Sequence, residues 1–473
     1  MIHDVIVVGA GPGGSSAASF LARRGVDVLL LDKSDFPRDK VCGDGLTPQA
    51  IYWCDRLGCI DEVLSQTQGV IHDCDLFVNG RRVLTGGFPD GTAYPDFAVL
   101  LDRRRFDHTL MRNALAHGAS FRPNVVVRGI ERDGEAATVL ARTPAGTEAF
   151  RARLVIGADG VSSVVSRAIG NQLKDGVMAV SLRAYFRGVR SAGAPIKVYF
   201  DRDYFPGYGW LFVDDTGFAN IGLGYAHDRY FPLADLGGLF RRFIANEMAE
   251  PLRDAERCGG VSGGSAAFYR PRTVVDDRVM LVGDAANQAD PLNGGGIHKA
   301  MEGAWFAAEA TAAALEKGDF SRQGLGRYET LLRQHVECDW QTAEIFLAIA
   351  KNPNLRDFCL FMLEQIGRLT GEDRRFEAFC AGVFSGVLSQ SIALSPRALY
   401  GAFPCDRAAW AAFLAANGGA AAPVRLASEA ASSLFTAGRS ALRDPLPNID
   451  WGLEIATKAL RLGSRHLSAW AGG

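Results

Sequence analysis

The sequence lacks the features that mark a secreted, membrane-spanning or nucleic-acid-binding chain. Its nine cysteines are odd in number and form no C-x-x-C pair, which favours a reduced, cytoplasmic setting and indicates no metal site. It has no uninterrupted apolar run of about 18 residues, so we expect no transmembrane helix. A strand typical of a protein core begins almost at the first residue, so we expect no signal peptide. The formal net charge of −2 excludes a broad basic surface, and with it nucleic acid as a partner. A globular protein of two or three domains fits the 473 residues.

A glycine motif near the start of the chain organises the sequence. Residues 4–8 form a mostly apolar run typical of a buried strand, residues 15–24 read as a helix, and residues 26–31 read as a second buried strand. The glycines between the first strand and the helix have the spacing Gly9-x-Gly11-x-x-Gly14. A strand, this motif, a helix, a strand and then an acidic residue form the context that a dinucleotide site requires.

Each residue of this motif has a physical reason to be there. Gly9 allows the tight turn, Gly11 lets the backbone approach a pyrophosphate, and Gly14 lets helix and strand pack closely. The helix N-terminus directs free N–H groups at the phosphates. Asp32 can accept hydrogen bonds from a ribose 2′-hydroxyl. The plain alternative, a structural turn in an α/β domain, does not explain the acid after the second strand.

Turn signals and periodicity outline the rest of the first two thirds of the chain. We expect a hairpin over residues 75–87 with an Asn-Gly turn, and an amphipathic helix over residues 101–118. Residues 154–156 read as a third buried parallel strand. Alternating strands then predict an antiparallel sheet, interrupted by a helical insertion over residues 228–256.

The last third reads as mostly helical. Helices are predicted over residues 297–317, over 323–350 as one long stretch, and over 355–388 as one or two helices. The final amphipathic stretch, residues 452–470, has two open interpretations. It either packs on its own protein or rests on a membrane surface, which would make the protein peripherally membrane-associated.

Three separated motifs together resemble the FAD-binding set of the p-hydroxybenzoate hydroxylase-like flavoproteins. They are Gly9-x-Gly11-x-x-Gly14, Gly157-Ala-Asp159-Gly160 and Gly283-Asp284-Ala285. That group includes aromatic hydroxylases, flavin halogenases and geranylgeranyl reductases. The resemblance covers roughly residues 4–310. It implies a Rossmann-like α/β FAD-binding domain, an inserted antiparallel-sheet substrate domain of α+β type, and a helical C-terminal region.

The resemblance implies domain boundaries and a cofactor site. The FAD-binding domain is expected at residues 1–70, 101–177 and 271–320, the substrate domain at 71–100 and 178–270, and the helical region at 321–473. Asp32 would bind the adenosine ribose, Arg103 the diphosphate and Asp284 the ribityl chain. The expected cofactor-binding residues are Gly9, Gly11, Pro12, Gly13, Gly14, Asp32, Lys33, Lys40, Cys42, Gly43, Arg103, Asp159, Gly160, Gly283, Asp284, Pro291, Gly294, Gly295, Gly296 and Ile297.

Two further stretches resemble geranylgeranyl reductases in particular. KVCGDG at residues 40–45 is similar to their cysteine–glycine loop. Tyr208-x-Trp210-x-Phe212 followed by Gly-x-Gly is similar to their Y-x-W-x-F-P strip, with Val213 in place of the proline. The resemblance implies Tyr208, Trp210 and Phe212 as substrate-lining residues, and Cys42, Tyr208 and Trp210 as catalytic candidates. The plain alternative is that the three aromatic residues share one face of an ordinary strand.

The leading hypothesis is therefore an FAD-dependent reductase of C=C bonds in a prenyl or similar hydrophobic substrate, with hydride from N5 of reduced FAD. NAD(P)H is the expected electron donor, and an electron-transfer partner is the alternative. A single-component monooxygenase that hydroxylates an aromatic or natural-product substrate through a flavin C4a-hydroperoxide stays open. A halogenase is disfavoured because no lysine lies between Lys40 and Lys174. A flavin-binding module without turnover is disfavoured by the intact Asp284 and glycine loop.

Overall fold

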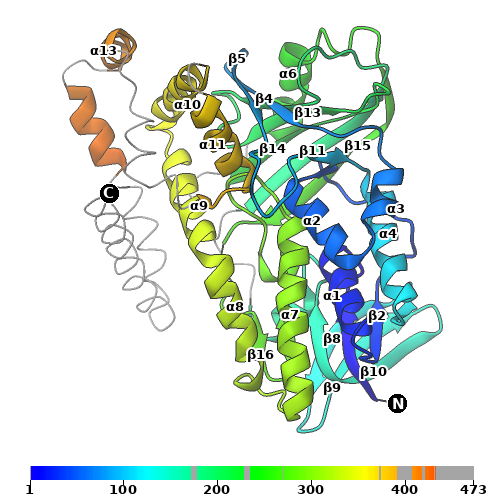
Figure 1. Cartoon of the computed structure of the whole chain (residues 1–473). Helices are drawn as coiled ribbons and strands as arrows, with labels where there is room; N and C mark the ends of the chain where they lie inside the picture. Colours follow the sequence, from blue (N-terminus) through cyan, green and yellow to red (C-terminus); the bar gives the residue numbers. More distant parts are fainter. Residues whose placement is uncertain are drawn as a thin grey trace.

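The computed structural model describes residues 2–171, 178–227, 235–269, 271–371, 374–390, 407–417, 421–430 and 432. Two large sheets lie one above the other in Figure 1, and helices flank both. The lower sheet has eight strands and the upper one has seven. The chain passes twice from the lower sheet to the upper one and back, and a set of helices follows the last strand of the lower sheet.

The eight-stranded sheet has the order β16-β17-β10-β1-β2-β7, extended by β8 and β9. Its strands are β1 (Ile2–Val8), β2 (Val28–Leu31), β7 (Ser120–Arg122), β8 (Val126–Arg132), β9 (Ala137–Thr143), β10 (Gly146–Gly157), β16 (Val275–Asp276) and β17 (Val279–Leu281). β1, β2, β7, β10 and β17 pair in parallel, as a doubly covered α/β sheet requires. The α/β prediction for this part is confirmed.

One strand is longer than the sequence predicts. Residues 154–156 were expected as a separate short strand, but they end β10, a strand of 12 residues. The first half of β10 pairs antiparallel with β9, and the second half pairs parallel with β1. The turn before Gly146 and the apolar run near Ile156 are therefore two ends of one element.

Both faces of this sheet are covered. Helices α1 (Pro12–Ala22), α4 (Arg103–Ala116) and α7 (Ile297–Lys317) pack on one face, together with α2 (Pro48–Leu57) and α3 (Ile60–Ser65). α1 lies beside α7 (Figure 1). The other face packs against the β8–β9 ribbon and the short helix α5 (Val164–Ala168). The small strands β3 (Gly45–Leu46) and β6 (Val99–Leu100) pair with each other, and the 3-10 turn η1 (Gly283–Ala286) follows β17.

The seven-stranded sheet has the order β15-β11-β14-β13-β12-β4-β5. Its strands are β4 (Asp73–Val78), β5 (Arg81–Gly87), β11 (Met178–Arg187), β12 (Ile196–Phe200), β13 (Tyr208–Val213), β14 (Ala219–His227) and β15 (Glu256–Ala267). The predicted hairpin is present as β4 and β5, and its Asn79-Gly80 turn has positive φ at both residues. All pairs in this sheet are antiparallel except β12 with β4.

The predicted helical insertion over residues 228–256 contains α6 (Leu236–Glu247), which packs on the upper sheet, and its residues 228–234 lie outside the described part of the chain. At its end begins β15, an edge strand of 12 residues that the sequence analysis did not predict. Its sequence, ERCGGVSGGSAA, contains four glycines and little apolar alternation, so neither propensity nor pattern indicates a strand. Hydrogen bonding to β11 holds these residues in a strand, although their own sequence does not favour one.

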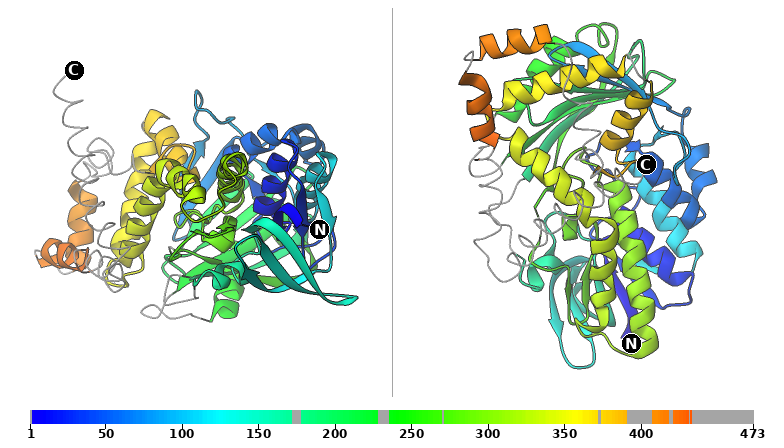
Figure 2. Two further views of the ribbon diagram at one scale, coloured as in Figure 1. Left: turned by 90° about the horizontal axis from the view of Figure 1, so that it is seen from below. Right: turned by 60° about the vertical axis from the view of Figure 1, so that its left-hand side comes forward.

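The C-terminal helices of the described part are α8 (Arg327–His335), α9 (Glu337–Ala350), α10 (Arg356–Thr370), α11 (Arg374–Ser385) and α13 (Arg407–Ala416). Of these, α8 lies beside α7, and α10 and α11 lie over β5 (Figure 2). The single helix expected over 323–350 is divided at Val336, preceded by the 3-10 turn η2 (Gly324–Gly326). The amphipathic stretch 452–470 lies outside the described residues. Within the described ranges, no helix is long and apolar enough to cross a membrane.

Gly367 decides how closely α10 approaches β5. A Cβ on Gly367 would lie 2.3 Å from the carbonyl oxygen of Val83. Overpacking of this kind costs ~1–3 kcal/mol, which exceeds the ~1 kcal/mol that alanine gains over glycine in a helix. The difference leaves a net loss, and we expect Gly367→Ala to lower the free energy of unfolding by up to about 2 kcal/mol in urea denaturation. Gly134→Ala is the control, since nothing lies within 4 Å of its Cβ position; equal stability of the two variants would contradict the prediction.

Candidate active site

A single cavity of about 800 Å³ extends from the N-terminus of α1 to the C-terminal end of α11. Every residue expected at the cofactor or substrate site lines it, with Gly14 as the one exception. Pockets of 300–1,000 Å³ are usual for small-molecule sites. The structure therefore brings together residues from positions 9 to 385, which the sequence keeps far apart.

The glycine motif makes a close crossing of three backbone segments. A Cβ on Gly14 would lie 1.8 Å from the carbonyl oxygen of Gly9, and a Cβ on Gly9 would lie 2.3 Å from the carbonyl oxygen of Ala158. Gly9 also has a φ of +99°. Only glycine fits at these two positions, and Gly14 accordingly packs α1 against the strand rather than lining the cavity. Gly11 is different, because its Cβ position has only Arg38 nearby, at 3.6 Å, and faces open space.

The carboxylate of Asp32 fixes the loops at the end of β1 and β2. It accepts hydrogen bonds from the backbone N–H of Ala10 at 2.7 Å and of Ser34 at 2.8 Å. Asp32 lines the cavity beside Gly11 and Pro12. No side chain caps the N-terminus of α1, so its first N–H groups are left for a ligand in the cavity.

Arg103 lies between an acid and the cysteine loop. Its Nε and one terminal nitrogen donate to Asp107 at 2.6 and 2.8 Å, and Arg38 adds a second cation at 2.9 Å from Asp107. Arg103 also lies within hydrogen-bonding reach of the Cys42 thiol. Burial raises the pKa of Cys42, and Arg103 partly opposes that rise. Cys42 is therefore a protonated thiol at neutral pH, with a cation beside it.

The carboxylate of Asp159 is hydrogen-bonded to residues that follow it closely in the chain. It accepts from Ser163 Oγ at 2.5 Å and from the backbone N–H of Val164 at 2.6 Å, at the start of α5. Burial nevertheless raises its pKa. Asp159 and Gly160 both line the cavity, so this turn forms part of its wall while its acid is already hydrogen-bonded.

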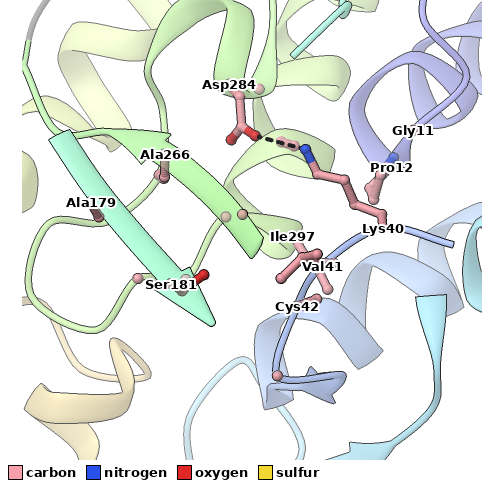
Figure 3. Close-up of a pocket in the computed structure, with 18 of the residues that line it drawn as sticks. Gly11, Pro12, Lys40, Val41, Cys42, Ala179, Ser181, Ala266, Asp284 and Ile297 are labelled. Atoms are coloured by element: carbon pink, nitrogen blue, oxygen red, sulfur yellow. Dashed lines mark ion pairs between the residues drawn. The ribbon is translucent and has the colours of Figure 1, made fainter. Parts of the chain in front are cut away.

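A second uncapped helix N-terminus faces the cavity from the opposite wall. Gly296 and Ile297 begin α7, no side chain caps it, and Asp284 lies close by. Lys40 reaches across the cavity, with its ammonium 4.0 Å from the Asp284 carboxylate (Figure 3). The first turn of α7 also holds His298, which burial keeps neutral by lowering its pKa to about 3. Sequence reasoning missed His298, since nothing local distinguishes it.

These features fit FAD. The open space beside Gly11, the two uncapped helix N-termini and the cations of Arg38, Lys40 and Arg103 suit a diphosphate-linked anionic cofactor. Asp32 beside α1 and Asp284 beside α7 supply hydroxyl-binding carboxylates at two separate points of the cavity. The charged residues that line the cavity all come from this end: Asp32, Lys33, Arg38, Asp39, Lys40, Arg103, Arg128, Asp159 and Asp284.

The far end of the cavity is apolar and aromatic. Tyr208, Trp210 and Phe212 point into it from alternate positions of β13, while Gly209 between them faces Phe243 of α6 on the other side of the sheet. Trp210 lies across its neighbour Gly222, where a Cβ would meet the indole at 2.1 Å. The Gly-x-Gly pattern after the strip therefore makes room for this indole.

β4, β5, β12 and α11 complete the apolar end. They contribute Cys74, Leu76, Leu84, Gly86, Ile196, Val198, Ala381, Phe384 and Ser385, and none of these is charged. A Cβ on Gly86 would lie 2.9 Å from Cβ of Ala381, so α11 closes directly onto β5. Polar recognition is thus confined to one end of the cavity and hydrocarbon contact to the other.

A buried polar network that the sequence did not reveal fixes the cysteine loop to this strip. Asp44 has a φ of +65° and accepts from Tyr185 Oη at 2.6 Å and Asn220 Nδ2 at 2.8 Å. Asn220 also donates to the carbonyl of Cys42 at 2.7 Å and accepts from Trp210 Nε1 at 2.9 Å. The loop and the indole are therefore tied to one amide. Burial raises the pKa of Asp44 to about 6.

Fold and site together define an FAD-dependent oxidoreductase. Residues 3–202 match the family described as FAD binding domain. The chain is 31% identical over 338 residues to digeranylgeranylglycerophospholipid reductase 1 of Methanothermobacter thermautotrophicus, covering 70% of this chain and 83% of that one. It is 30% identical over 350 residues to menaquinone reductase of Mycolicibacterium smegmatis, covering 70% and 80%. A solved geranylgeranyl bacteriochlorophyll reductase-like protein of Thermoplasma acidophilum shares the fold, with a TM-score of 0.66, 23% identity, and coverage of 88% and 99%.

The chain belongs to the geranylgeranyl reductase family within the p-hydroxybenzoate hydroxylase-like FAD-dependent oxidoreductases. The family, the fold class, FAD as cofactor and the oxidoreductase class predicted from sequence are thereby confirmed.

Asp44 makes the stability of the protein depend on pH in a defined direction. Because the pKa of Asp44 is raised in the folded state, protonation of Asp44 stabilises the folded protein. This stabilisation is fully present below the unfolded pKa of about 3.8 and is lost as the pH rises through about 6. Between pH 4 and 7 we expect the wild type to lose ~2–3 kcal/mol of unfolding free energy relative to Asp44→Asn. Urea denaturation at several pH values measures this. The exposed Asp254→Asn should follow the wild type, and parallel curves for all three proteins would refute the assignment.

Proposed function

We propose that this protein reduces isolated C=C bonds in the prenyl chain of a hydrophobic substrate. One observation carries the proposal: the cavity continues from the charged flavin end into a region where none of the described lining residues is charged. A hydrocarbon needs apolar area and offers few polar handles, which this region matches. The relatives are named for reductions of a digeranylgeranyl lipid and of menaquinone, both consistent with such a substrate.

The chain's own residues would position the alkene and supply the proton. Bound FAD, once reduced by two electrons, supplies a hydride. The aromatic strip and Phe384 would hold the alkene and exclude water. The Cys42 thiol would donate its proton to one alkene carbon as the π bond breaks, the other carbon being the one that receives the hydride. Arg103 would stabilise the resulting thiolate, which solvent would reprotonate after the product leaves.

Burial keeps the Cys42 thiol protonated at neutral pH, and the Arg103 cation beside it opposes the rise in its pKa, which eases release of the proton. Gly43 brings the cysteine loop against the strip, since its Cβ position is 2.7 Å from Phe212 Cε2. Tyr208 and Trp210 would hold the substrate in place rather than donate protons to it, because Tyr208 Oη already donates to Asn293 and Trp210 Nε1 to Asn220. NAD(P)H is the proposed donor of electrons to the flavin, with an electron-transfer partner as the alternative.

Anaerobic turnover tests the proposed function. The bound flavin is reduced with dithionite, geranylgeraniol is added without oxygen, and flavin absorbance and product mass are followed. We expect reoxidation of the flavin and a product two mass units heavier for each reduced bond. A flavin that stays reduced until oxygen is admitted, and then yields a product heavier by one oxygen atom from an aromatic substrate, would replace the proposal with a monooxygenase.

Replacing the proton donor should slow turnover without removing the flavin. We expect Cys42→Ser to lower kcat about 100-fold, because a serine hydroxyl is a far weaker acid, while the flavin content stays at the wild-type level. Cys258→Ser is the matched control, since Cys258 is a half-buried cysteine of β15 that does not line the cavity. Equal rates for the wild type and both variants would exclude Cys42 as the donor.

A further inference from the structure

We propose that Asn293 is a positioning residue that fixes the substrate wall of the cavity relative to the flavin loop, and so sets how the alkene is presented. This inference rests on the proposed function and deepens it. Asn293 lies in the loop before α7, lines the cavity, and joins three of its walls. The motifs of the sequence include the proline and the glycines around Asn293 but not Asn293 itself.

The first two links come from the Asn293 side chain. Its Oδ1 accepts from the backbone N–H of Gly295 at 2.7 Å, which shapes the glycine loop expected beside the isoalloxazine. Its Nδ2 donates to the carbonyl of Phe384 at 2.9 Å, at the C-terminal end of α11. Carbonyls in the last turn of a helix have no partner inside the helix, so this amide caps α11 from the flavin side.

The third link comes from the Asn293 backbone. The Asn293 carbonyl oxygen accepts a hydrogen bond from Tyr208 Oη at 2.6 Å. The next residue, Gly294, leaves room for this contact, because a Cβ there would lie 3.0 Å from Tyr208 Oη. Tyr208 and Phe384 both pack on Phe200, with ring centroids 5.9 and 6.2 Å apart. One residue therefore ties the flavin loop to two aromatic groups on facing walls of the apolar end.

Two neighbouring bonds strengthen the same connection. Gln49 Nε2 donates to the carbonyl of Ser385 at 3.2 Å, and Gln390 Nε2 donates to Asp290 Oδ2 at 2.5 Å. Both join the end of α11 to segments next to the flavin. Tyr208 and Phe384 share one apolar cluster around Phe200, and α7 behind the flavin loop belongs to another. Loss of the Asn293 side chain should therefore shift the flavin loop relative to the apolar end rather than unfold either of them.

Ligand binding separates this role from a merely structural one. Binding of phytanol, a saturated isoprenoid alcohol that cannot be reduced, is followed by the change that it causes in the absorbance of bound FAD. Two lost hydrogen bonds predict about tenfold weaker binding of phytanol to Asn293→Ala than to the wild type. Asn171→Ala is the control: Asn171 is more buried than Asn293, likewise donates to a backbone carbonyl (that of Thr273, at 2.8 Å), and does not line the cavity. It should bind phytanol as the wild type does.

Turnover supplies a second readout. With geranylgeraniol we expect Asn293→Ala to raise KM more than it lowers kcat, and to release a larger share of partly reduced products. Tyr208→Phe removes only the third link, and its effect on phytanol binding should be less than additive with that of Asn293→Ala. If Asn293→Ala cannot be purified folded, Tyr208→Phe alone must weaken phytanol binding for the proposal to stand.

The outcomes distinguish the two proposals. Unchanged phytanol binding in Asn293→Ala, or loss of its flavin, would overturn the positioning role. A wild type that binds phytanol but reduces no prenyl compound would overturn the proposed function alone, and the binding comparison would still decide the role of Asn293. A wild type in which phytanol causes no change in the flavin absorbance would overturn both.

Discussion

The structure depends on one backbone crossing, where β1, α1 and the end of β10 meet without side chains. The Cβ position of Gly14 lies 1.8 Å from the Gly9 carbonyl oxygen, and that of Gly9 lies 2.3 Å from the Ala158 carbonyl oxygen. Close packing here places the uncapped N-terminus of α1 at the cavity and aligns it with the uncapped N-terminus of α7. Positive potential for an anionic cofactor therefore comes from two helix N-termini together with the cations of Arg38, Lys40 and Arg103.

The second sheet completes the site by contributing surface rather than charge. β13 alternates between a cavity face with Tyr208, Trp210 and Phe212 and an outer face where Gly209 meets Phe243. The polar atoms of this strip are bonded to Asn220 and Asn293 instead of being offered to a ligand. Those two amides attach the strip to the cysteine loop and to the flavin loop. The apolar end thus keeps a fixed position relative to the flavin end.

The sequence predicted the parts of this arrangement that are local. The strand, turn, helix and strand that lead to Asp32 each have characteristic residues in the sequence. Both the order of these elements and the class of cofactor could therefore be predicted. β15 was missed because its glycines give no pattern and its pairing with β11 is non-local. Asp44, His298 and Asn293 could not be predicted, since their roles arise from partners that lie 85 to 251 positions away in the chain. Family resemblance, rather than spacing, indicated Cys42 and the aromatic strip.

The division of one cavity into a charged end and a hydrocarbon end is the central claim. A crystal structure of the FAD complex with phytanol bound tests it most directly. We predict the isoalloxazine beside Gly294–Ile297 and Cys42, and the hydrocarbon between Tyr208, Trp210, Phe212 and the end of α11. An isoalloxazine that fills the apolar end, or a hydrocarbon bound outside the aromatic strip, would contradict the account.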